Sequence, residues 1–339
     1  MMRQQPLLRT AHVAPSAVMA ALFIMTSSGI CLAANRLALV VQVSDYVNQE
    51  IPPLHLRGER MNDASMMKEV LSSPKYGFSV DVLDGDSATH DKIVAALDKL
   101  ASSAQPDDAV VFYFSGLGAN DGNQFTLCPV DALPDKADFD IKETDIVAWL
   151  ARLKARNVTL ILDCCFTKSG GRVLQRAWWK FIGRANTVLD KDHPLMQIDP
   201  NRAVVMSAAS DKGEAFEIQQ AVRNTAVGLF TRYLAWTLKN AAADATYAQA
   251  FDNLKTHFRF YYAGQDVPRD KMQTPTMYGS DRLVNRPLFS PVAVSNVSRN
   301  AKRPTTARTS APKSPSVAIA LASTHRTSRV ASCIGDARL

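Results

Sequence analysis

Residues 161–171 read ILDCCFTKSGG, and their first two residues are the last two of the apolar stretch 158–162. A short continuous apolar stretch with a glycine pair just beyond it is typical of a buried strand in a parallel sheet. Because Asp163 and Cys164 follow this stretch, the pattern predicts that Cys165 lies at the carboxyl end of a strand. Open α/β sheets bind their ligands at that edge.

A second segment, residues 112–120, reads FYFSGLGAN and is organised in the same way. Other apolar stretches of strand length recur along the chain, and helical patterns such as 92–100 lie between them. The predicted strands are 37–43, 78–83, 108–114, 158–162 and 203–207. Strands that alternate with helices imply a mostly parallel sheet with helices on both faces.

The glycines of the second segment do not form a dinucleotide-binding motif. Gly116, Gly118 and Gly122 are spaced G-x-G-x-x-x-G, whereas the motif requires G-x-G-x-x-G. The motif also requires an acidic residue at a set distance, after the second strand, and the sequence has none there. The sequence therefore argues against a dinucleotide-binding fold.

The two segments together resemble the catalytic loops of the caspase and metacaspase cysteine peptidases. The family pattern Asp-x-Cys aligns Asp163 with an acid of the substrate pocket and Cys165 with the nucleophile. Where the family carries Ser-Gly-His-Gly, residues 115–118 read Ser-Gly-Leu-Gly, so Leu117 occupies the position of the catalytic histidine. Leu117 and Cys165 are 48 positions apart, in keeping with the spacing of roughly 50 known for caspases.

Further segments resemble the family in the same order along the chain. Residues 54–67 are similar to its Gly-x-x-x-Asn-Asp-Ala-x-x-Met stretch, in which Asn62 and Asp63 would start the first helix. Other matching segments are 208–217, 228–231 and 273–275. The resemblance covers residues 36–290 and implies a caspase-like three-layer α/β/α sandwich around a sheet of about six strands.

The resemblance also implies roles for individual residues. An acidic pocket would bind an Arg or Lys side chain before the scissile bond, and two carboxylates suit such a cation electrostatically. Its members are Asp63, Ser115 and Asp163. Backbone N–H groups near the nucleophile would hold the oxyanion. Their candidates are Gly116, Gly118 and Cys165. An alternative for Asp63 is a helix cap, and an alternative for Cys164 and Cys165 is a pair of small buried hydrophobic residues.

Leu117 leaves the predicted site without its general base. Leucine carries no titratable group, and loss of general acid–base help costs on the order of 10² to 10⁴ in rate. The other histidines with which the site could be rescued are distant in the sequence: His55, His90, His193 and His257. We therefore expect a cysteine endopeptidase homologue with impaired catalysis. The alternatives are an active endopeptidase that uses another base, and a binding or regulatory module without catalysis.

No cofactor is expected from the sequence. Four aspartates follow residue 130 without the spacing of an EF-hand, so calcium is not expected and these residues are interpreted as a polar surface loop. They are Asp131, Asp135, Asp138 and Asp140. The cysteines beyond the amino-terminal segment form neither a disulfide framework nor a zinc pattern, and we expect thiols. They are Cys128, Cys164, Cys165 and Cys333.

Residues 1–33 have the features of a secretory signal peptide. Arg3 and Arg9 precede the apolar stretch 17–30, and small residues near Ala33 offer a cleavage site. The apolar stretch is shorter than a typical transmembrane helix, and an uncleaved membrane anchor is the alternative. The protein is therefore predicted to be exported, either to a periplasm or out of the cell.

Residues 291–339 form a basic tail rich in Ser, Thr, Pro and Ala. This composition cannot bury enough apolar surface to offset the entropy of ordering, so the tail is predicted to be disordered. Its basic residues account for the formal net charge of +7. Such a tail suits contact with an anionic surface, and a solubilising or vestigial extension is the alternative. Nothing in the sequence resembles a nucleic-acid-binding module.

Overall fold

The structure is a computed structural model that describes residues 34–51, 53–54, 62–120, 124–164, 177–179, 198–209, 215–220, 225–265, 267–269 and 272–290. All of these residues belong to one compact unit, Met1–Ala293. The predicted signal peptide, the predicted basic tail and Cys165 lie outside the described residues.

A six-stranded sheet in the described residues forms the centre of this unit, in the order β12-β9-β7-β3-β1-β2. Its strands are β1 (Arg36–Gln42), β2 (Ser79–Asp84), β3 (Ala109–Ser115), β7 (Asn157–Asp163), β9 (Val204–Ser207) and β12 (Thr276–Tyr278). All neighbours pair in parallel except β12, which runs antiparallel to β9 at one edge. The predicted mostly parallel sheet is thus confirmed.

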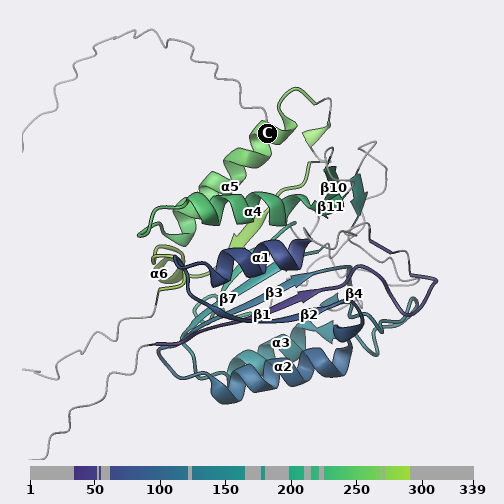
Figure 1. The fold of residues 1–339 in the computed structure, drawn as a ribbon, viewed down its shortest axis with the longest axis horizontal. Coiled ribbons are helices and arrows are strands. Elements are labelled where there is room, and N and C mark those ends of the chain that lie inside the picture. The colour runs from purple at the N-terminus through teal and green to yellow at the C-terminus, as the bar shows by residue number, and fades with distance from the viewer. Residues whose placement is uncertain are drawn as a thin grey trace, which may run out of the picture. The chain divides into compact units, whose positions relative to one another are not determined.

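Helices cover both faces of the sheet (Figure 1). One face carries α2 (His90–Ser103) and α3 (Glu143–Arg152), and the other carries α1 (Asp63–Ser72), α4 (Leu229–Asn240) and α5 (Tyr247–Tyr262). Because side chains alternate along a strand, Phe112 packs in the core with Trp149 of α3, whereas Tyr113 packs in the other core with Met67 of α1. The arrangement is the predicted three-layer sandwich.

Two small antiparallel sheets flank the carboxyl ends of the central strands. One contains β4 (Gly118–Asn120), β5 (Phe125–Leu127) and β6 (Ile141–Lys142), and the other contains β8 (Ala177–Trp179), β10 (Phe216–Gln220) and β11 (Thr225–Gly228). A 3₁₀ turn, η1 (Gly85–Ser87), and a short helix, α6 (Asp281–Val284), complete the described elements. β4 begins directly after Leu117, and β11 runs directly into α4.

Local sequence accounts for the start of α1. The Asn62 side chain accepts the Ser65 N–H at 2.8 Å, and the Ser65 hydroxyl accepts the Asn62 N–H at 3.0 Å. This reciprocal capping box satisfies backbone donors that the first turn leaves open. The predicted helix start at Asn62 and Asp63 is confirmed.

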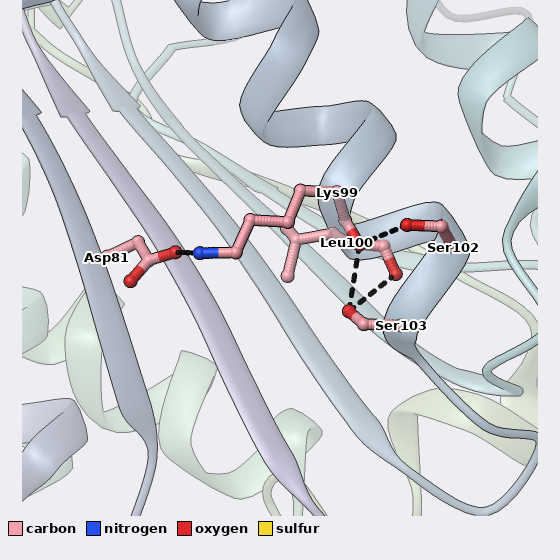
Figure 2. A network of polar contacts seen from close by, with 5 residues as sticks. All are labelled: Asp81, Lys99, Leu100, Ser102 and Ser103. Carbon is pink, nitrogen blue, oxygen red and sulfur yellow. Dashed lines mark hydrogen bonds and ion pairs between the residues drawn. The ribbon is translucent and has the colours of Figure 1, made fainter.

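Figure 2 shows the polar contacts at the end of α2, one of which reaches Asp81 of β2. The Lys99 ammonium lies 2.8 Å from Asp81 Oδ2, and the hydroxyls of Ser102 and Ser103 donate to the Lys99 carbonyl at 2.9 and 2.8 Å. The Lys99–Asp81 pair is exposed, and exposed ion pairs contribute only about 0 to 1 kcal/mol. The buried apolar face of α2, rather than this network, therefore holds the helix on the sheet.

The interpretation of the four aspartates as a surface loop is wrong for Asp140. Its side chain is buried, and its Oδ2 accepts the Thr126 hydroxyl at 2.5 Å. The hairpin of β5 and β6 brings these two residues together. Asp131 is half-buried and accepts the His90 N–H at 2.9 Å, so it pairs with a backbone donor in the first turn of α2, which Thr89 caps. Asp135 and Asp138 are exposed, as predicted.

Arg202, two residues before β9, connects this part of the chain with the carboxyl end of α3. Its guanidinium donates to the carbonyls of Leu150 at 2.8 and 3.2 Å, of Ala155 at 2.6 Å, and of Leu153. These carbonyls lie at and just beyond the helix end, where intrahelical partners run out. A half-buried guanidinium therefore satisfies several acceptors at once.

We expect Arg202→Met to lower the free energy of unfolding by about 2 kcal/mol, because hydrogen bonds from charged groups contribute roughly 1.5 to 3 kcal/mol. Urea unfolding followed by circular dichroism measures the change. Arg156→Met is the matched control, since Arg156 is exposed and lies 4.0 Å from Asp107. Equal losses in the two variants would contradict this role for Arg202.

Candidate active site

The two predicted loops meet at the carboxyl edge of the central sheet. Ser115, the last residue of β3, is in parallel register with Asp163, the last residue of β7. The Gly116 N–H also donates to the Asp163 carbonyl at 3.4 Å. The strands therefore bring together the Ser-Gly-Leu-Gly turn and the residue that lies two positions before Cys165.

Asp63 connects α1 with this edge and with α4. Its buried carboxylate accepts the Ser115 hydroxyl at 2.6 Å through Oδ2 and the Gly228 N–H at 2.8 Å through Oδ1. Asn62 is the residue that caps α1. The alternative of Asp63 as the cap of its own helix is thus wrong, and its carboxylate instead holds the start of α4.

Asp163 is also held by the start of α4. Its Oδ2 accepts the Thr231 hydroxyl at 2.6 Å and the Thr231 N–H at 3.2 Å. The Tyr113 hydroxyl lies 2.5 Å from Thr231 Oγ1. Burial, and then the charges of Asp63 and Asp163, raise the pKa of Tyr113 well above its usual value. Tyr113 therefore keeps its proton and donates to Thr231, which donates to Asp163.

The carboxylates of Asp63 and Asp163 thus both face the amino-terminal end of one helix. Gly228 is the N-cap residue of α4 and Thr231 lies in its first turn. Unpaired N–H groups give a helix a partial positive charge at this end, which favours nearby carboxylates. Sequence reasoning did not assign roles to Gly228 and Thr231, although the segment 228–231 had been matched to the family. Their roles depend on contacts with residues far away in the chain.

Leu117 is buried where the turn leaves β3. Its N–H donates to the Tyr46 hydroxyl at 2.9 Å, and its carbonyl accepts the Cys128 N–H at 3.0 Å. Its side chain is 1% exposed and belongs to the core on the α2 and α3 side of the sheet. Burial is the main cause that raises the pKa of Tyr46 well above its usual value. The turn is therefore anchored by its backbone, and its apolar side chain, at the predicted position of the base, packs in the core.

Gly116 and Gly118 stand on either side of Leu117. A Cβ on Gly116 would come within 2.9 Å of the Phe114 ring, so the close approach of this turn to β3 requires glycine. Gly118 begins β4 and pairs with Leu127. Cys165, the third member of the predicted oxyanion set, lies outside the described residues.

A family model of the caspase domain, peptidase family C14, matches residues 35–284. The chain belongs to the caspase domain family. A crystal structure of the protein GSU0716 from Geobacter sulfurreducens is similar to this chain, with a TM-score of 0.53 and 16% identity over 76% of this chain and 99% of that chain. At this identity the likeness concerns the fold alone. The comparison with curated proteins gave no significant match.

The caspase domain carries two histidines within its described residues, and both have other contacts. The Nδ1 atom of His90 lies 3.0 Å from Asp91 at the start of α2. The ring of His257, on α5, stacks on Tyr233 with a centroid distance of 5.6 Å. Neither belongs to the elements that carry Leu117 or Asp163. His55 and His193 lie outside the described residues.

The thiols of Cys128 and Cys164 are buried in the caspase domain. For Cys164 this agrees with the interpretation as a small buried residue next to the strand. In the described part of the chain, no group of three or more His, Cys, Asp or Glu side chains is placed to hold a metal ion. Among the same residues, none of the helices has the length and apolar character needed to cross a bilayer.

Proposed function

We propose that this caspase domain is a metacaspase-like homologue of cysteine endopeptidases, with Cys165 at the nucleophile position and severely impaired peptidase activity. The observation that supports this proposal is the burial of Leu117 two residues beyond the end of β3, the strand that pairs with β7 and therefore with the segment that precedes Cys165. A leucine at this place neither takes the thiol proton nor protonates the leaving amine.

The loss of the base affects the protonation of the Cys165 thiol. An ordinary cysteine has a pKa of about 8.5, so only a few per cent is thiolate at neutral pH. Without a base, amide cleavage also lacks a proton donor for the leaving nitrogen. A reactive thiol without proton transfer would form adducts with electrophiles more readily than it would cleave amides.

The acidic pocket supports a retained peptide-binding function. Asp63 and Asp163 are both buried at the sheet edge, and Ser115 lies between them by register and hydrogen bonding. The start of α4 holds both carboxylates in place, which prepares them for a guanidinium or ammonium group. We therefore propose that this sheet edge selects a peptide with Arg or Lys before the site of cleavage in active relatives.

Retention of the pocket without the base favours a binding or regulatory module as the second candidate function. A peptide probe that ends in arginine and carries a thiol-reactive group separates the two. Covalent labelling of Cys165, seen by mass spectrometry of the digested protein, supports the enzyme homologue. Saturable binding without labelling supports the module. Neither labelling nor binding would contradict both proposals.

We further propose that the protein is exported and that residues 1–33 are removed. The basic start, the apolar stretch 17–30 and the small residues near Ala33 motivate this proposal. Amino-terminal sequencing of the protein from its natural cell measures the outcome, and we expect a chain that begins close to Ala34. Recovery of a chain that starts at Met1 from the soluble cytosolic fraction would contradict export. In an exported protein, the basic tail would be available to anionic surfaces of the cell envelope.

A further inference from the structure

A hollow of about 430 Å³ lies on the face of the domain formed by α1, α4 and α5. This volume is within the range of roughly 300 to 1,000 Å³ that is typical of ligand sites. Its lining is contributed by Met66, Glu69, Val70, Arg232, Tyr233, Ala235, Trp236, Lys239 and His257. None of these residues belongs to the candidate active site.

Aromatic rings form one wall of the hollow. Tyr233 and His257 stack with an interplanar angle of 8°, and the Trp236 ring meets His257 edge-on at a centroid distance of 4.3 Å. Trp236 is nevertheless 52% exposed, and Phe260, one turn beyond His257 on α5, is 73% exposed. Exposed large apolar side chains that gather on one face mark interaction sites. Phe260 thus adds an exposed apolar side chain on α5, beyond the residues that line the hollow.

The charges around the hollow do not balance. Lys239 and Glu69 form an ion pair at 2.6 Å and offset each other. Arg232 makes no ion pair within the described part of the chain. Its positive charge partly offsets the rise that burial causes in the pKa of the nearby Tyr233 and Tyr261 hydroxyls. Burial lowers the pKa of His257, which keeps its ring uncharged at neutral pH. Among the described residues, the Arg232 guanidinium therefore stands beside the aromatic wall of the hollow without an ion-pair partner.

We propose that this hollow is a docking site for a peptide segment of a partner protein in which a carboxylate side chain adjoins an aromatic one. The aromatic ring would stack in the hollow against Trp236 and His257, and the carboxylate would pair with Arg232. A peptide fits better than a compact ligand because a further exposed apolar side chain, Phe260, is available on α5 beyond the hollow. The proposal is independent of peptidase activity, since it uses the outer face of the helices and not the sheet edge.

Calorimetry of the full-length protein with two short capped peptides tests the proposal. One peptide carries Trp between two Glu residues, and the other carries Trp between two Lys residues. We expect the acidic peptide to bind at least about tenfold more tightly, because only its carboxylates complement the guanidinium. Arg232→Glu and Trp236→Ala should each weaken its binding by at least about tenfold.

Two variants elsewhere on the surface serve as matched controls. Arg282→Glu makes the same charge reversal on α6, and Val147→Ala trims an exposed apolar residue of α3. Both should leave the binding of the acidic peptide unchanged. Equal affinity for the two peptides, or natural affinity in Arg232→Glu, would overturn the proposal. Competition by a peptide that ends in arginine would place the binding at the sheet edge and would overturn it as well.

Discussion

Leu117→His is expected to raise the amidase activity on an Arg-containing peptide by at least about tenfold, because general acid–base catalysis contributes on the order of 10² to 10⁴. The new imidazole would stand at the end of β3, whose last residue is in register with Asp163 of β7. A fluorogenic peptide amide measures the gain. The backbone contacts of residue 117 with Tyr46 and Cys128 do not depend on its side chain, so the turn should keep its conformation.

Two controls separate restored catalysis from a change of packing. Leu117→Asn introduces a polar side chain of similar reach without a titratable group, and it should show no gain. Cys165→Ala in the Leu117→His background should abolish the gain, because the thiol is the proposed nucleophile. A folded Leu117→His protein with the activity of Leu117→Asn would show that the site lacks more than its base.

Asp163→Asn is expected to erase most of the preference for basic peptides. The natural protein should bind a peptide that ends in arginine at least about tenfold better than one that ends in aspartate, since charge-assisted hydrogen bonds are worth roughly 1.5 to 3 kcal/mol. The asparagine keeps the shape of the side chain and an oxygen that accepts from Thr231, but it removes the charge. Calorimetry on folded protein measures both affinities.

Thr231→Val is the matched control for this charge. It removes the hydroxyl that donates to Asp163 and leaves the backbone N–H contact and the carboxylate in place. We expect this variant to keep the preference for arginine. It should lower the thermal stability, because the Thr231 hydroxyl also accepts the hydrogen bond from the buried Tyr113 hydroxyl. Equal affinity of the natural protein for both peptides would remove the support for a basic pocket and would favour a scaffold without a peptide site.

Local sequence was sufficient for the central layer of the fold. The apolar stretches 108–114 and 158–162 were predicted as strands, and β3 and β7 begin and end within one residue of them. Both strands are buried on both faces, which is why their sequences are continuously apolar rather than alternating. The start of α1 was equally predictable, because a capping box involves only residues 62–65.

The resemblance to the family implied that Ser115 and Asp163 share one site, and the parallel register of β3 and β7 places them side by side. The carboxyl ends of parallel strands lie at one edge of a sheet, where open α/β folds bind ligands. The absence of an imidazole at Leu117 was also evident from the sequence. The burial of that leucine in the core required the tertiary structure, because it depends on packing against the opposite helices.

Contacts between distant segments decided the remaining features. The interpretation of the sequence places Asp140 in a polar surface loop, yet the β5–β6 hairpin buries it against Thr126. Thr231 lies 68 positions from the Asp163 that it holds, and no local pattern in either segment indicates the pairing. The sequence by itself thus determined the strands and the first helix start, because these depend on neighbouring residues. The assignment of Leu117 to the position of the base rests on the resemblance to the family and stays a prediction. Only the tertiary structure decided which groups hold the carboxylates of Asp63 and Asp163. It alone also placed Trp236 and His257 beside a hollow. Both features depend on how separate helices pack on one sheet.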